Sequence, residues 1–257
     1  MKANDIINII EKVCPENLAY PWDNVGLLCG DGEKKVNKIF VTLDTNIKTV
    51  KEAIEKKADM IVSHHPILLS GIKRIDYTTS DGQMIKLLIE NNIPLFAAHT
   101  NMDTAKGGIN DRLSDIFNLT DVEILEQHTC DSTAGLGRIG KLKNTVKFND
   151  FAKKCKEVLN TTVRAAGDFN TNIKTVAVAS GSCSDIIPLA KEKGADVIIT
   201  GDMKYHNMID MTELGICVID AGHYPTEICV MDIFEDILKD CDIKIIKSEN
   251  KDIFNFI

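Results

Sequence analysis

The fold is decided by two stretches that repeat one another: residues 39–63 read IFVTLDTNIKTVKEAIEKKADMIVS, and residues 176–200 read VAVASGSCSDIIPLAKEKGADVIIT. Each has an apolar run, an amphipathic segment of helix length, a small residue followed by Asp, and a second apolar run. This order is typical of a β-α-β unit, whose parallel strands are buried on both faces and joined by a right-handed crossover. Aligned without a gap, the stretches share Val41/Val178, Ala53/Ala190, Glu55/Glu192, Lys56/Lys193, Ala58/Ala195, Asp59/Asp196 and Ile61/Ile198.

A third apolar run follows each unit, at Ile93–Ala98 and at Ile216–Ala221, and leads into a polar segment. Two unrelated β-α-β units that look alike by convergence would explain the apolar runs, but not polar segments that also match. In each segment a histidine precedes a carboxylate by four positions: His99 and Asp103 in the first, His223 and Glu227 in the second. We therefore predict an α/β protein with an internal duplication. We assign residues 1–128 and 220–257 to the first half and residues 129–219 to the second.

The remaining segments are predicted from periodicity and turn residues. Gly135–Gly140 matches the pattern GxGxxG, but no apolar strand precedes it and no helix follows, so a glycine-rich strand is favoured over a dinucleotide site. We expect helices at Ile6–Val13, about Asp150–Leu159 and about Thr226–Leu238, and strands at Val25–Leu28, Gly135–Leu142, Thr162–Ala166 and Ile243–Ile246.

Composition restricts the class of protein. A chain of 257 residues with 44% hydrophobic and 26% charged residues is ordinary for a globular protein. The net charge of -8, without a basic stripe, makes nucleic acid an improbable partner. No apolar run approaches the roughly 18 residues of a membrane span. None of the eight cysteines forms a CxxC pair, and reduced thiols are consistent with a cytoplasmic protein.

Polar side chains gather where the predicted strands end, and they point to a metal site. Ligands of parallel sheets bind beyond the carboxyl ends of the strands, so one edge of the fold should collect these groups. Imidazole nitrogens and carboxylate oxygens suit Zn, Fe, Mn, Ni or Co. Each motif is weak alone, because a His–His pair is often a surface feature and HxxxE spacing is common. The candidate ligands are His64, His65, Asp103, His223 and Glu227.

Spacing suggests how these ligands are arranged. If Pro225 begins a helix, His223 and Glu227 share one face of it. Adjacent residues of an extended chain point in opposite directions, so His64 and His65 more naturally serve two ions than one. They would converge on one ion only if the strand ended between them. Bridging carboxylates would then neutralise two cations held about 3.5–4 Å apart.

Other polar residues at strand ends are candidates for supporting roles. Asp202 and His206 follow the strand at 197–199 and could contact a ligand or a substrate, although an exposed turn is nearly as plausible. Asp44 follows the strand at 41–43 and could support a metal ligand. We expect Trp22 to pack in the core, while Asp23 or Asn24 could face the metal.

Taken together, five motifs resemble the Nif-three-like family, whose members are called type 2 homologs of GTP cyclohydrolase I. The resemblance covers nearly the whole chain, in the short form that lacks an inserted middle domain. The motifs are Pro21-Trp22-Asp23-Asn24-Val25-Gly26-Leu27, Ser63-His64-His65-Pro66, Ala98-His99-Thr100-Asn101-Met102-Asp103, Thr200-Gly201-Asp202 with His206, and Gly222-His223-Tyr224-Pro225-Thr226-Glu227.

The resemblance implies two intertwined three-layer α/β/α halves with two divalent metal ions in the cleft between them. It implies the five ligands named above and, by analogy, a hexameric ring of subunits. The family's label implies hydrolytic opening of a purine ring in a nucleotide or related small molecule. His99 would orient a ligand or carry a proton, and Asp202 and His206 would contact the substrate. The alternative is a protein without enzymatic activity that carries iron or another metal, or that acts as a metal-responsive partner.

Overall fold

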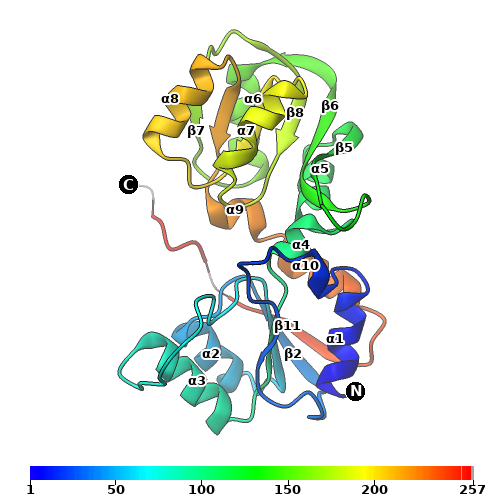
Figure 1. Cartoon of the computed structure of the whole chain (residues 1–257), viewed down its shortest axis with the longest axis vertical. Helices are drawn as coiled ribbons and strands as arrows, with labels where there is room; N and C mark the ends of the chain where they lie inside the picture. The colour runs from blue at the N-terminus through cyan, green and yellow to red at the C-terminus, as the bar shows by residue number, and fades with distance from the viewer. Residues whose placement is uncertain (250, 256–257) are drawn as a thin grey trace. The chain divides into compact units, whose positions relative to one another are not determined.

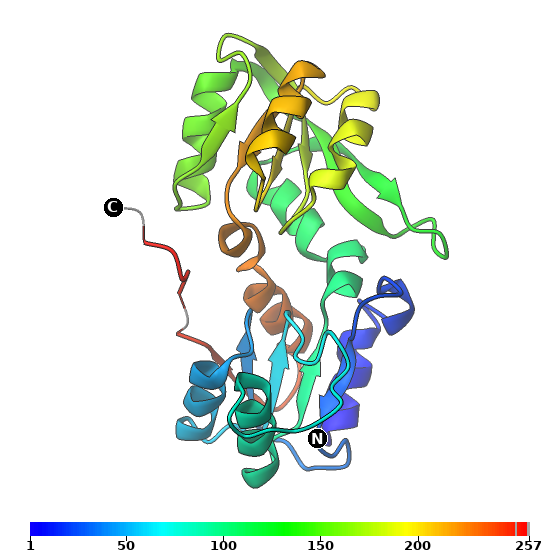
Figure 2. The ribbon, with the colours of Figure 1, turned by 60° about the vertical axis from the view of Figure 1, so that its left-hand side comes forward.

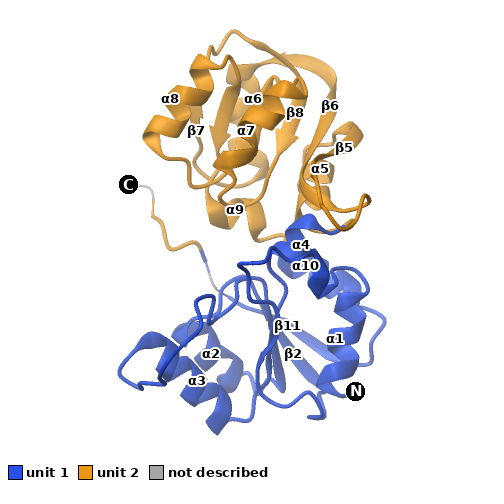
Figure 3. Cartoon of the chain, viewed as in Figure 1, with its two compact units in different colours: residues 1–105, 230–251 blue, residues 106–229, 252–257 orange. Residues whose placement is uncertain are grey.

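The structure, a computed structural model, describes residues 1–249 and 251–255 and divides into two compact units (Figure 3). Unit 1 comprises Met1–Ala105 and Val230–Lys251, and unit 2 comprises Lys106–Cys229 and Asp252–Ile257. These bounds differ from those of the predicted halves, because residues 252–257 and two longer segments, 106–128 and 220–229, fall in unit 2. The strand at 120–127 pairs with its neighbour at 135–147, and the strand ending at Asp220 belongs to the same sheet. Hydrogen bonding therefore places both segments with unit 2.

Unit 1 contains a five-stranded sheet in the order β1-β4-β3-β2-β11. The four strands β2, β3, β4 and β11 run parallel, whereas β1 pairs antiparallel with β4. Every residue of β3 and β4 is buried, as expected for parallel strands covered on both faces. The strands are β1 (Gly26–Cys29), β2 (Lys38–Thr42), β3 (Met60–Ser63), β4 (Leu95–Ala97) and β11 (Lys244–Lys247).

Helices cover both faces of this sheet (Figure 1). On one face, α2 and α3 pack against Phe40 and Ile61 in one apolar cluster. On the other face lie α1 and α10. Asn46 begins α2 because its side chain accepts hydrogen bonds from the amides of Lys48 and Thr49, at 2.9 and 3.1 Å. The helices are α1 (Ala3–Glu11), η1 (Glu16–Leu18), α2 (Ile47–Glu55), α3 (Ser80–Glu90), α4 (Thr100–Thr104) and α10 (Val230–Leu238).

Unit 2 contains a six-stranded sheet in the order β5-β6-β8-β9-β10-β7. Its three central strands β8, β9 and β10 are parallel, and the flanking strands pair antiparallel. Figure 2 shows α7 and α8 on one face and α6 on the other. The strands are β5 (Thr120–Gln127), β6 (Gly135–Lys147), β7 (Arg164–Ala166), β8 (Asn172–Val178), β9 (Val197–Thr200) and β10 (Cys217–Asp220). The helices are α5 (Ile109–Ile116), α6 (Phe148–Val158), η2 (Ser184–Ile186), α7 (Ile187–Glu192), α8 (Tyr205–Glu213) and α9 (His223–Glu227).

The two units share one arrangement, so the predicted α/β fold with repeated β-α-β units is confirmed. In unit 1 the order β1-β4-β3-β2 places an antiparallel strand beside the third parallel strand, and in unit 2 the order β7-β10-β9-β8 does the same. A short helix follows the third strand in each unit, α4 after β4 and α9 after β10. The units differ at the other edge of the sheet, where β11 takes the place of the β5–β6 hairpin.

Several local predictions need correction. The helix expected at about Thr226–Leu238 is two helices, α9 and α10, because the chain passes from unit 2 to unit 1 after Cys229. The helices α3, α5 and α8 and the strand β5 were not predicted. The glycine-rich segment at Gly135 begins strand β6, as predicted, although this strand continues to Lys147. No helix in the described part of the chain is long and apolar enough to cross a membrane.

Candidate metal centre

The first group of candidate ligands lies in unit 1, beyond the carboxyl ends of β3 and β4. His64 and His65 follow Ser63, where β3 ends, so both histidines stand outside the regular strand. His99 directly precedes α4, and Asp103 lies within it. Since β3 and β4 are adjacent and parallel, their ends bring these two loops together. We call His64, His65, His99 and Asp103 the unit 1 half-site.

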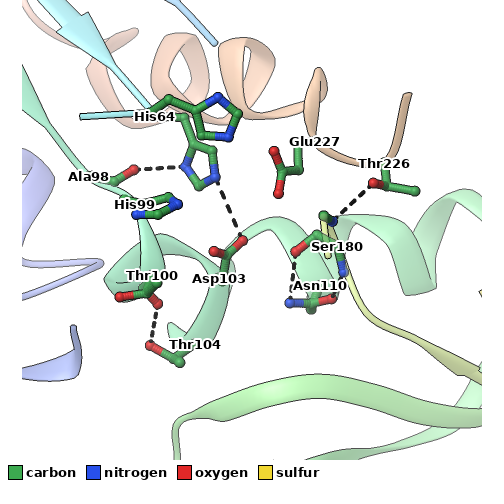
Figure 4. Close-up of polar contacts among 12 residues, drawn as sticks. His64, Ala98, His99, Thr100, Asp103, Thr104, Asn110, Ser180, Thr226 and Glu227 are labelled. Atoms are coloured by element: carbon green, nitrogen blue, oxygen red, sulfur yellow. Dashed lines mark hydrogen bonds and ion pairs between the residues drawn. The ribbon is translucent and has the colours of Figure 1, made fainter. Parts of the chain in front are cut away.

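His64 is fully buried and has a defined orientation. Its Nδ1 lies 2.8 Å from the carbonyl oxygen of Ala98 (Figure 4). A carbonyl oxygen only accepts hydrogen bonds, so Nδ1 carries the hydrogen, and Nε2 of the neutral ring holds the lone pair. This Nε2 lies 3.8 Å from Oδ1 of Asp103. His64 therefore directs the ring nitrogen that could bind a metal toward a carboxylate of the same unit.

The other two histidines of unit 1 are oriented by carboxylates. Nδ1 of His65 lies 2.7 Å from Oδ1 of Asp44, and Nδ1 of His99 lies 2.8 Å from Oδ1 of Asp23. Burial would raise the pKa of Asp23, but hydrogen bonds from His99 and Thr100 outweigh it and lower the pKa to about 2. Asp23 is therefore ionised at neutral pH and accepts the Nδ1 hydrogen of His99.

These contacts make the three imidazoles converge. The ring centroids of His64, His65 and His99 lie 5.0 to 5.6 Å apart. One ring nitrogen from each lies within 4.8 Å of the others, as three ligands of one ion would. Metal-binding histidines typically donate the second ring N–H to a carboxylate or a carbonyl, which is the pattern at all three positions. The donor set of unit 1 thus fits a divalent first-row metal.

The second group lies in unit 2, on the short helix α9. Nε2 of His223 lies 3.0 Å from Oε2 of Glu227, one helical turn away. Nδ1 of His223 lies 2.7 Å from Oδ2 of Asp202, which follows β9. The carboxylate of Glu227 is almost fully buried, with 4% of the side chain exposed. We call His223 and Glu227 the unit 2 half-site, and its histidine has the same carboxylate support as His65 and His99.

Gly181, which sequence reasoning did not identify, lies directly against both residues of this half-site. It adopts a positive φ of 61°, and a Cβ atom there would lie 2.1 Å from Oε1 of Glu227 and 3.2 Å from Nε2 of His223. Its amide donates a hydrogen bond to the hydroxyl of Thr226 at 3.0 Å. Only glycine therefore lets the backbone approach both ligands so closely. The only feature of the sequence that could have identified Gly181 is its place in the loop directly after β8.

The predicted supporting residues divide into two groups. Asp44 and Asp202 contact a candidate ligand directly, and Asp23 does so as well. His206 lies on α8, where its ring meets Tyr205 edge-on, 5.5 Å between centroids. The expectation that Trp22 packs in the core is wrong, since 60% of this residue is exposed. A tight turn after Pro21 directs its side chain outward.

Known proteins resemble this chain over its whole length. The model of the family Duf34/NIF3 (NGG1p interacting factor 3) matches residues 1–253. A GTP cyclohydrolase 1 type 2 homolog from Clostridium perfringens is 41% identical, and the match covers 100% of both chains. A Bacillus cereus protein related to NIF3 superposes with a TM-score of 0.91 at 25% identity, covering 100% of this chain and 99% of that one. Reduced HcgD from Methanocaldococcus jannaschii gives 0.85 at 34% identity, covering 97% and 98%. The chain therefore belongs to the Duf34/NIF3 family.

Proposed function

We propose that this protein is a metal-dependent hydrolase that binds two divalent ions through His64, His65, Asp103, His223 and Glu227. The observation that carries the proposal is the orientation of the histidines. In both units a carboxylate or a carbonyl accepts a hydrogen bond from Nδ1, which leaves Nε2 as the metal-binding nitrogen. Histidines that bind a metal almost always donate their second ring N–H to a carboxylate, a carbonyl or water in this way.

The path of the chain also bears on this set of five ligands. Asp103 lies two residues before Ala105, where the chain leaves unit 1, and Glu227 lies two residues before Cys229, where it leaves unit 2. The carboxylate of each half-site is thus close in sequence to a point where the chain crosses from one unit to the other. In the proposed centre, His64 and His65 of unit 1 and His223 of unit 2 would bind the ions, and the carboxylates of Asp103 and Glu227 would balance the charge.

Hydrolysis is the reaction that such a centre suits best. When bound, two divalent ions would supply positive charge that activates water and polarises the substrate. His99 is placed to move a proton at Nε2, because Asp23 holds its Nδ1 hydrogen and fixes the ring. The name of the Clostridium perfringens relative, a GTP cyclohydrolase 1 type 2 homolog, favours a purine nucleotide as substrate.

Elemental analysis of protein purified without added metal tests the centre first. We expect about two ions per chain in the wild type and loss of most of them in Glu227→Ala. His128→Ala is the matched control, because this histidine lies between β5 and β6, outside both half-sites. A metal-free wild type that stays empty after reconstitution would refute the centre.

An assay of nucleotide hydrolysis tests the activity. We expect hydrolysis by the wild type but not by His64→Ala, and equal rates in the two proteins would refute the activity.

A metal carrier is the second candidate, and the exposure of two ligands favours it. The side chain of His65 is 23% exposed and that of His223 is 34% exposed, so a chelator could reach them. A carrier would exchange its ions with a chelator within seconds and hydrolyse no nucleotide. A hydrolase would retain its ions over many turnovers. Measuring metal exchange and turnover on one preparation decides between the two functions.

A further inference from the structure

An exposed aromatic side chain lies beside the unit 1 half-site. Trp22 is 60% exposed, although tryptophan is among the side chains that gain most from burial. Its ring is nearly parallel to that of Tyr20, with centroids 6.0 Å apart and planes 5° apart. The ring of His99 meets Trp22 edge-on at 6.1 Å. One side of the indole is thus supported by protein, and much of the ring remains open to solvent.

Trp22 is held in a rigid turn. The amide of Asp23 donates a hydrogen bond to the carbonyl oxygen of Tyr20 at 2.9 Å, which closes a turn with Pro21 in its second position. The carboxylate of Asp23 is fully buried and accepts hydrogen bonds from the amide and the hydroxyl of Thr100, at 3.0 and 2.5 Å. The amide of Tyr20 donates to the same hydroxyl at 3.0 Å. The turn is therefore fastened to the start of α4, the helix that carries Asp103.

This anchoring gives the indole a fixed position relative to the candidate ligands. Asp23 orients His99 through Nδ1 and holds the turn that presents Trp22. A planar ring that stacked on Trp22 would bring its substituents alongside the imidazole of His99. Stacking of a nucleobase on an aromatic side chain is favourable and tolerates different bases, because every base has a π-face.

We propose that Trp22, supported by Tyr20, is the stacking platform for a planar heteroaromatic ring of nucleobase size in the substrate. That the ring belongs to a substrate rests on the proposed function, whereas stacking of a ring on Trp22 requires no metal. A ring-bearing small molecule fits this surface better than a second copy of the chain does. The preceding residues Glu16 and Asn17 are exposed and polar, which disfavours a broad apolar contact.

Fluorescence tests the platform directly, because Trp22 is the only tryptophan in the chain. We would excite at 295 nm and titrate the full chain with guanosine monophosphate and with ribose 5-phosphate, which lacks the ring. Guanosine monophosphate is expected to quench the emission and ribose 5-phosphate to leave it unchanged. The quenching should persist after metal is removed with a chelator, since Trp22 holds no ion.

The outcomes separate the platform from the metal function. Ring-dependent quenching together with empty metal sites would retain the platform and refute the proposed hydrolase. No quenching by guanosine monophosphate would overturn the platform, whatever the metal content. An emission maximum that shifts with protein concentration, but not with ligand, would assign Trp22 to a contact between subunits and also overturn it.

Substitution gives the second test, read by calorimetry with guanosine monophosphate. Trp22→Leu should raise the Kd roughly 10- to 100-fold, and Trp22→Tyr should retain most of the affinity. Tyr205→Leu is the matched control, because Tyr205 is an exposed aromatic residue in the other unit. Metal content should be unchanged in all three variants. Equal affinity of the wild type and Trp22→Leu would overturn the proposal, as would equal losses in the Leu and Tyr variants.

Discussion

The two half-sites lie on similar β-α-β scaffolds but hold and orient their candidate ligands in different ways. In unit 1, ligands from two loops converge, and each histidine has its own support in Ala98, Asp44 or Asp23. In unit 2, both ligands lie on the single short helix α9, and the support is Asp202 with the close backbone of Gly181. The repeated β-α-β unit thus determines where candidate ligands occur, at the ends of its strands, while the loops determine how many there are.

The comparison predicts that loss of His64 has the largest effect. His64 is fully buried and its Nε2 lies 3.8 Å from Oδ1 of Asp103, so no solvent-exposed group can replace it easily. His64→Ala should weaken metal binding by more than about 100-fold, because loss of a mere supporting residue costs 10- to 100-fold. Dialysis against graded chelator followed by elemental analysis measures it.

Glu227→Ala tests whether unit 1 contributes more to metal binding than unit 2. It removes a candidate ligand from unit 2 and leaves the three imidazoles of unit 1 in place. It should therefore retain more metal than His64→Ala under the same dialysis. If Glu227→Ala lost more metal than His64→Ala, unit 2 would be the principal half-site and the comparison would be reversed.

Gly181→Ala is expected to have the next largest effect, and it acts on unit 2 alone. The added methyl group would meet Oε1 of Glu227 at 2.1 Å in a backbone conformation that already disfavours alanine. We expect a loss of about 2–3 kcal/mol in the free energy of unfolding, together with weaker metal binding. Urea unfolding and metal analysis of the same preparation measure the two effects.

Gly194→Ala is the control for backbone strain, since Gly194 also has a positive φ, of 83°, but nothing lies within 4 Å of an added Cβ. It should lose only about 1 kcal/mol and keep its metal. Equal metal content in the two variants would show that the approach of Gly181 to Glu227 is unimportant for binding.

The substitutions Asp44→Asn and Asp202→Asn test the carboxylates that orient His65 in unit 1 and His223 in unit 2. Each substitution keeps the shape of the side chain but removes the negative charge that accepts the Nδ1 hydrogen of His65 or His223. Both should weaken metal binding by about 10- to 100-fold without loss of the fold. Chelator competition measures the affinity, with Asp121→Asn on strand β5 as a control. An unchanged affinity in one variant would confine the supporting role to the other unit.

The sequence could place the candidate ligands at the ends of strands, because that position follows from local order. The repeat of residues 39–63 in residues 176–200 predicts parallel strands, and polar residues at their ends predict a shared edge. Asp44, Asp202 and Asp23 were predicted as candidates for support, but the histidine that each of them orients could not be predicted. The pairing of Asp23 with His99 joins residues 76 positions apart, and the fit of Gly181 to Glu227 depends on a backbone angle. Trp22 was misplaced for a related reason, because burial was inferred from residue type while a turn decides its direction.

The smallest predicted effect is electrostatic and belongs to Asp23, the support of His99 that unit 2 does not duplicate. Its pKa is lowered from 3.8 to about 2, so its ionised form stabilises the fold at pH values above 4. This stabilisation is lost as pH falls from about 4 to about 2, because the folded protein must then bind a proton that it disfavours. Because asparagine can still accept hydrogen bonds from Thr100, we expect Asp23→Asn to cost only about 1 kcal/mol at pH 7 in metal-free protein. Urea unfolding at pH 7, 5, 4 and 3 should show the difference from the wild type shrinking only below pH 4. A difference that stayed constant down to pH 3 would assign the cost to shape rather than charge, and His99 would then be positioned without help from an ionised carboxylate.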